Sequence, residues 1–227
     1  MHFPSLTFAF ADALLYAVQV SIVVPLVVVW WWHHFTVPVR LLSVYVYMVL
    51  LALMATRVFL VEGGSGSIAF LTGFNCAKLV LLGPVYYQVL RRPKARQLIM
   101  PLIVVSLAGI LVVIYYSLPL ALSTSRVVQC TLLSGLALLY LDQFSNRAIV
   151  PFTTRDVMCL VSIGQLLFSA ITITAFSFEY GSHIAMQLNF KQLFIALGSL
   201  AFNIFLTLAF LRDHQPAPIM VARRAQV

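Results

Sequence analysis

Uninterrupted apolar segments follow one another along most of this chain, and they severely limit the folds open to it. Of its 227 residues, 62% are hydrophobic and only 9% are charged, whereas soluble domains contain about 25% charged residues. A single soluble core of this size cannot bury so much apolar surface, so we expect an integral membrane protein. The runs are continuously apolar and do not alternate with polar residues, which predicts helices rather than barrel strands.

The length of the apolar segments predicts seven transmembrane helices, because a helix needs roughly 20 residues to cross the bilayer core. The predicted spans are about 9–32, 41–61, 68–90, 98–120, 127–144, 157–178 and 192–211. Short connections such as "EGGSGS", "RRPKARQ" and "ALSTSR" separate them and leave no room for a soluble domain. The predicted fold class is therefore an all-α, polytopic bundle of seven transmembrane helices, forming one domain over residues 1–211 with a basic tail over 212–227.

The distribution of basic residues predicts the orientation. Ten of them fall on one side of the predicted spans: Arg40, Arg91, Arg92, Lys94, Arg96, Arg147, Arg155, Arg212, Arg223 and Arg224. Three fall on the other side: Arg57, Arg126 and Lys191. By the positive-inside rule, the N-terminus is outside and the C-terminus is in the cytoplasm, as in a multi-pass protein of the inner (cytoplasmic) membrane. This explanation accounts for the net charge of +8, so the predicted partner is the lipid bilayer and not nucleic acid.

The segment "TGFNCAKLVLLGPVYY", residues 72–87, places Lys78 near the middle of the third predicted span. A charge at the bilayer centre costs about 3 kcal/mol on insertion scales, so such a residue is a candidate functional residue. All six acidic residues fall near the ends of spans, which leaves the lysine without a carboxylate at its depth. Two interpretations stand. Lys78 binds a ligand that carries a carboxylate or another acceptor, or it has a structural role only, either as a neutral amine or as a packing element held by backbone and amide oxygens.

Four amide side chains share that depth and complete the candidate ligand site: Gln19, Asn75, Gln165 and Asn203. Asn75 and Lys78 are three residues apart and lie on one helix face. The amides would serve a ligand, or else form interhelical hydrogen bonds, a common use of amides in membrane bundles. Gly83 and Pro84 predict a kink below Lys78 that would act as a hinge.

The sequence offers no positive sign of catalysis or of a cofactor. The three cysteines, Cys76, Cys130 and Cys159, lie inside apolar segments and indicate neither disulfides nor a metal site. The histidines form no HExxH or HxxxH pattern. Nucleophile motifs and paired intramembrane carboxylates are also missing, so no catalytic residue, metal ligand or cofactor is predicted.

Three segments carry a resemblance to known proteins: "VPVRLLSVYVYMVLLAL", "LVLLGPVYYQVLRRP" and "NFKQLFIALGSLAFNIFLTLAFLR". With the overall layout, they resemble uncharacterised bacterial seven-transmembrane proteins and the seven-helix sensory domains of bacterial histidine kinases. The resemblance implies a sensor-like or accessory protein that binds a small or lipidic ligand. Because only a short tail follows Arg212, we expect a signalling partner to provide the output. A small-solute transporter with a midplane site around Lys78 is the alternative, and a membrane-embedded lipid enzyme is the third.

Overall fold

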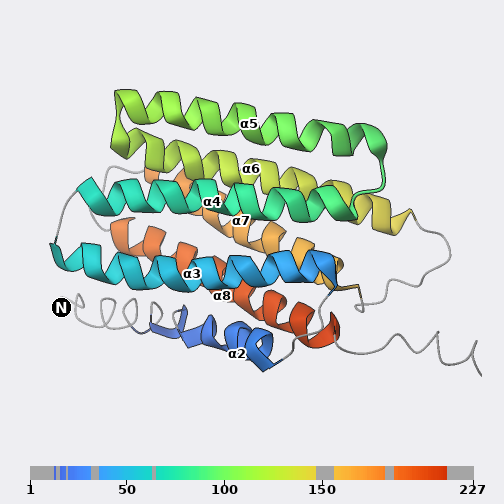
Figure 1. The fold of residues 1–227 in the computed structure, drawn as a ribbon. Coiled ribbons are helices and arrows are strands. Elements are labelled where there is room, and N and C mark those ends of the chain that lie inside the picture. Colours follow the sequence, from blue (N-terminus) through green and yellow to red (C-terminus); the bar gives the residue numbers. More distant parts are fainter. Residues whose placement is uncertain are drawn as a thin grey trace, which may run out of the picture.

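The part of the chain that the structure describes is entirely helical, without a strand (Figure 1). This computed structural model describes residue 13 and residues 16–18, 20–31, 36–62, 65–146, 156–181 and 187–213. Its helices are α2 (Val23–Trp31), α3 (Val37–Glu62), α4 (Ser65–Val89), α5 (Pro93–Tyr116), α6 (Leu118–Ser145), α7 (Val157–Gly181) and α8 (Gln187–Asp213). The predicted all-α class is confirmed for these residues.

Among the residues that the structure describes, five helical segments are long and apolar enough to cross a membrane. They are Ile68–Val89, Pro93–Tyr116, Leu118–Ser145, Val157–Phe176 and Leu193–Asp213. Two shorter apolar helices precede them, Tyr16–Trp31 and Val37–Ala52. Helices suit this environment because each satisfies its backbone hydrogen bonds within its own segment, where lipid offers no partner. The chain therefore has the architecture of a helical, multi-pass membrane protein.

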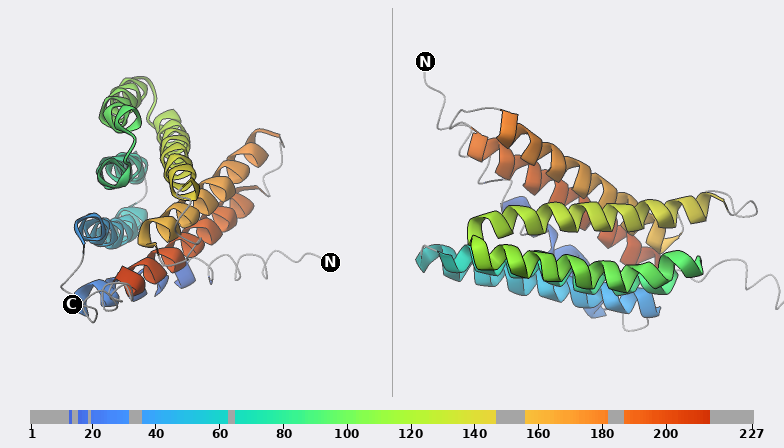
Figure 2. Two further views of the ribbon diagram at one scale, coloured as in Figure 1. Left: turned by 90° about the vertical axis from the view of Figure 1, so that its right-hand side faces the viewer. Right: turned by 90° about the horizontal axis from the view of Figure 1, so that it is seen from above.

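Contacts between the helices close a ring around a common interior. Helix α3 packs on α4, α4 on α6, α6 on α7, α7 on α8, and α2 joins α8 back to α3. Helix α5 lies outside this ring against α4 and α6, as the end-on view in Figure 2 shows. Its position explains why only 17% of its apolar window is buried, against 56% for α7.

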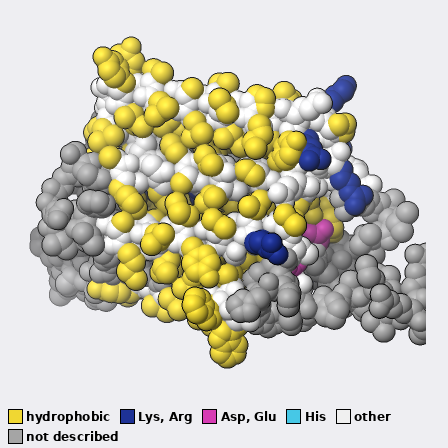
Figure 3. Space-filling view, viewed as in Figure 1, with side chains coloured by type: hydrophobic (Ala, Val, Ile, Leu, Met, Phe, Trp, Pro, Cys, Tyr) yellow, Lys and Arg dark blue, Asp and Glu magenta, His cyan; other side chains and the backbone are white. Residues whose placement is uncertain are grey.

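Hydrophobic side chains cover most of the described face in Figure 3, as expected of a surface that faces lipid. Exposed aromatic residues mark its two ends: Trp30 and Trp31 at the end of α2, and Tyr115 and Tyr116 at the end of α5, which lies at the opposite end of the bundle. Tryptophan and tyrosine favour the two membrane–water interfaces.

The connection predicted at 121–126, "ALSTSR", is wrong, because these residues are helical. Helix α5 ends at Tyr116 and α6 begins at Leu118, so the predicted spans 98–120 and 127–144 misplace the boundary. Pro119 stands in the first turn of α6, where a missing N–H costs nothing. The polar residues remain helical because their hydroxyls bond within the helix; Ser125 Oγ donates to the Leu122 carbonyl at 2.9 Å.

Helices α7 and α8 form the most extensive contact in the described bundle, and Gly164 allows it. A Cβ atom at Gly164 would lie 2.7 Å from Phe205 Cβ and 3.3 Å from Phe202 Cδ2, on α8. Small residues at such crossings let two membrane helices approach closely. The approach also sets the position of Phe202, which lies 2% exposed in the interior.

We expect Gly164→Ala to destabilise the protein by about 1–3 kcal/mol, because overpacking forces α7 and α8 apart. The measurement is the thermal midpoint of the purified protein in detergent. Gly135→Ala is the matched control, since a Cβ there meets nothing within 4 Å and alanine favours a helix by about 1 kcal/mol. Equal midpoints for the two variants would contradict the close α7–α8 contact.

Candidate functional site

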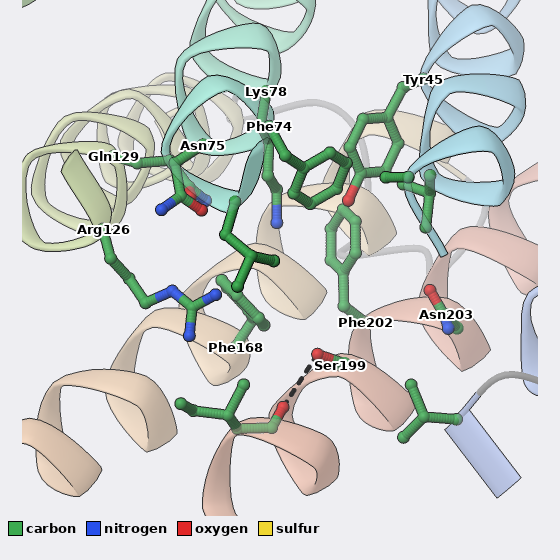
Figure 4. Close-up of a pocket in the computed structure, with 15 residues that line it drawn as sticks. Tyr45, Phe74, Asn75, Lys78, Arg126, Gln129, Phe168, Ser199, Phe202 and Asn203 are labelled. Carbon is green, nitrogen blue, oxygen red and sulfur yellow. Dashed lines mark hydrogen bonds between the residues drawn. The ribbon is translucent and has the colours of Figure 1, made fainter. Parts of the chain in front are cut away.

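A cavity of about 130 Å³ lies inside the ring, between α3, α4, α6, α7 and α8. Figure 4 shows the side chains that point into it. Its lining consists of Val18, Tyr45, Val49, Ala52, Leu71, Phe74, Asn75, Lys78, Arg126, Gln129, Phe168, Ile195, Ser199, Phe202 and Asn203. The cavity is thus mostly apolar, with a few polar side chains, which is the usual make-up of a small-molecule site.

Helical periodicity explains why these residues meet at one place. On α4 the lining residues Leu71, Phe74, Asn75 and Lys78 recur at three- and four-residue intervals, so they form one stripe. The same spacing separates the lining residues of α3 (Tyr45, Val49 and Ala52) and those of α8 (Ile195, Ser199, Phe202 and Asn203). Each helix therefore turns a single face toward the cavity.

Lys78 is the central residue of the site and is only 3% exposed. Its Nζ lies 3.9 Å from the ring centroid of Phe168, 4.7 Å from that of Phe202 and 5.5 Å from that of Tyr45. These distances fall within the range of cation–π attraction. Three helices other than its own thus place an aromatic cage around the lysine.

The aromatic cage stabilises the positive charge of Lys78 but accepts no hydrogen bond of ordinary strength from the N–H groups of its ammonium. Each ring contact is worth about 0.5–2 kcal/mol, so together they are comparable with the insertion cost of about 3 kcal/mol. Within the described part of the chain, no oxygen accepts a hydrogen bond from Lys78 Nζ. An ammonium has three N–H donors, and those that the rings do not face remain available to a ligand.

Arg126 is a second cation on the same cavity, and the sequence analysis placed it in an outer loop. It lies well inside α6, three residues before Gln129, and Figure 4 shows its guanidinium directed into the cavity. No ion pair or hydrogen bond joins it to another described residue. The available sequence signal was Pro119, which marks a helix start seven residues earlier.

The three acidic residues whose side chains the structure describes lie at the opposite end of the bundle from these cations. Asp142 pairs with Arg92 at 2.8 Å, and Asp156 accepts a hydrogen bond from Tyr140 OH at 2.9 Å. Asp213 Oδ2 accepts from the Thr36 backbone N–H at 3.0 Å. The cavity therefore carries two basic side chains and, among its lining residues, no acidic one.

Two of the predicted amides line the cavity, and each is tied to a serine. Asn75 Nδ2 donates to Ser125 Oγ at 3.0 Å, and Asn203 Nδ2 donates to Ser21 Oγ at 2.8 Å. Both amides thus join helices as well as line the site. Gln129, which the sequence analysis did not select, is 1% exposed, and its Nε2 has no hydrogen-bond partner.

A third predicted amide, Gln165, does not join this group. Gln165 is buried outside the cavity lining, and its Nε2 donates to Ser169 Oγ at 2.9 Å on its own helix. It belongs to a buried polar stripe along α7 with Ser162, Ser169 and Thr172. Gln19 lies outside the described residues.

The predicted hinge residues also lie away from the cavity. Helix α4 continues through Gly83 and Pro84 to Val89. A Cβ atom at Gly83 would overlap Ile103 Cδ1, so this glycine has a packing role where α5 meets α4. The hinge remains a prediction. In the described residues no three His, Cys, Asp or Glu side chains gather as metal ligands.

These observations define a helical, multi-pass membrane protein with a cationic, aromatic-lined internal cavity. No protein-family model, curated protein or solved structure matches the chain. The function is therefore inferred from the chemistry of the residues that line the cavity.

We expect Lys78→Met to fold with an unchanged or higher thermal midpoint. The change removes a costly buried charge, breaks no hydrogen bond between described residues, and leaves a thioether that packs favourably against aromatic rings. Asn75→Leu is the contrast: it removes the bond to Ser125 and should destabilise by about 1 kcal/mol. Both midpoints are measured by thermal denaturation in detergent. A large loss in Lys78→Met alone would assign the lysine a structural role.

Proposed function

We propose that this protein is a sensor-like or accessory membrane component that binds a small or lipidic ligand in the cavity around Lys78 and acts through a partner. The observation that carries the proposal is the placement of Lys78, a buried cation on a cavity wall with no acceptor from any described residue. Buried charges in proteins are normally paired. A ligand that carries an acceptor would supply the missing partner.

The surroundings of Lys78 support a binding role over a purely structural one. A lysine that only packed against its aromatic cage would need no cavity beside it. Here the space continues past the cage to Arg126 and Gln129, whose donors are also unused. Three side chains with free donors thus converge on one volume, which is a common arrangement in a specific ligand site.

The proposed topology has seven transmembrane helices, with the N-terminus outside and the C-terminus in the cytoplasm of an inner-membrane protein. The basic residues of the described part support this orientation. Arg40 lies in the first turn of α3, Arg91 and Arg92 lie between α4 and α5, and Lys94 and Arg96 lie in the first turn of α5. All five are exposed, at one end of the bundle (Figure 3). This basic face is the proposed surface for a cytoplasmic signalling partner, beside anionic lipid headgroups.

A small-solute transporter is the second candidate, and the depth of Lys78 favours it. Lys78 lies near the middle of α4, and transporters bind their substrates near the bilayer midplane. The two candidates differ in what they require. A transporter moves solute across the membrane by itself, whereas a sensor binds its ligand without transport and passes the change to a partner.

Native mass spectrometry of the protein purified from its own membranes tests the proposal. We expect a retained small molecule or lipid in the wild-type protein, lost in Lys78→Met but kept in Lys94→Met, whose lysine is exposed at the basic face. Co-purification of a regulator without solute flux in proteoliposomes supports the sensor. Flux that depends on Lys78 supports the transporter. If Lys78→Met folds normally and changes neither ligand retention nor any physiological output, the proposal is wrong.

Cysteine labelling on α5 tests the orientation, because this helix exposes residues at both ends. In a background without native cysteines, we expect Tyr116→Cys to react with a membrane-impermeant maleimide added outside intact cells. Lys94→Cys should react only after the membrane is opened, since it would lie in the cytoplasm. The reverse pattern would contradict the proposed topology.

A further inference from the structure

We infer that the cavity selects a small organic carboxylate about the size of one aromatic ring, held by Arg126 and Lys78. This inference rests on the proposed function and names the class of ligand. Both side chains reach the same cavity from different helices, α6 and α4 (Figure 4). Neither forms a hydrogen bond or an ion pair with any side chain that the structure describes.

The charge of the cavity specifies an anion. Its described lining includes two basic side chains and no acidic one, so a cationic ligand would be repelled. The aromatic cage, which could otherwise accept an organic cation, is already occupied by Lys78 Nζ at 3.9 Å from the Phe168 centroid. An anion would instead meet attractive charges in an apolar environment, where electrostatic attraction is strong.

The donor chemistry favours a carboxylate among small anions. A guanidinium presents a planar fork of N–H groups that matches a carboxylate through two parallel hydrogen bonds. Lys78 provides a second charged donor, and the unpartnered Gln129 Nε2 a neutral one. This set satisfies the two oxygens of one carboxylate and leaves the rest of the ligand against the apolar wall.

The size and lining of the cavity limit the rest of the ligand. Its volume of about 130 Å³ is close to that of an engineered apolar cavity of about 150 Å³ that binds benzene. The cavity lining also includes the rings of Phe74, Phe168 and Phe202, which favour an aromatic or branched aliphatic group. A full acyl chain exceeds this volume, so a small organic acid fits the cavity better than a long-chain fatty acid does.

Thermal-shift and calorimetric titrations with benzoate test the inference, using the full chain in a neutral detergent. We expect benzoate to raise the midpoint at millimolar concentrations, because a ligand that binds only the folded state stabilises it. Benzamide, its neutral isostere, should give no shift. Palmitate distinguishes a lipid source of the carboxylate from a free small acid.

Two variants test the two properties of the cavity that the inference uses, its positive charge and its free volume. Arg126→Gln should weaken benzoate binding by about tenfold or more, because it removes a charged, bidentate donor. Ser199→Leu should abolish binding by filling the cavity while keeping both cations. The matched controls are Arg91→Gln, an exposed arginine at the opposite end, and Thr207→Leu, on the same helix but outside the cavity lining. Both controls should bind benzoate like the wild type.

Three results would overturn the inference. They are binding of benzamide as tight as that of benzoate, binding of palmitate without benzoate, and benzoate binding that survives both Arg126→Gln and Ser199→Leu. If none of the three compounds binds, the carboxylate class is wrong. A ligand of another class retained in native mass spectrometry would then still uphold the proposed function, so the two failures can be told apart. If Arg126→Gln does not fold, Ser199→Leu and its control decide the result.

Discussion

The absence of hydrogen-bond partners in lipid is the constraint on which this structure depends. Every backbone N–H and C=O in the apolar segments must be satisfied within its own helix, so the chain becomes a series of helices with short connections. The polar side chains then have to find partners inside the bundle. Ser125 meets Asn75, and Ser169 meets Gln165, each away from the lipid-facing surface.

The cavity follows from the way the helices pack around that polar interior. Helices α7 and α8 lie close together because Gly164 carries no side chain, and this brings Phe168 and Phe202 to one wall. Helix α4 places Lys78 opposite them, and α6 adds Arg126. The result is a mostly apolar pocket that two basic side chains line, with aromatic rings around one of them.

Much of the fold could be predicted from the sequence, but only part of the site. Continuous hydropathy predicted the all-helical, multi-pass architecture, and the position of Lys78 in its segment predicted its place near the middle of a helix. Arg126 was misassigned because "ALSTSR" resembles a polar turn, although serine and threonine hydroxyls can bond within a helix. Gln165 was selected by depth alone, and depth does not reveal which neighbour a side chain faces.

The sequence by itself determined that this is a helical membrane protein with a lysine deep in one helix, because hydropathy and helix length are local properties. Only the tertiary structure decided that Tyr45, Phe168 and Phe202 surround that lysine and that Arg126 shares its cavity. Apolar residues occupy nearly every face of these helices, so their periodicity does not mark the inner one. The residues that surround Lys78 therefore become known only from the order in which the helices pack and from the rotation of each helix about its axis.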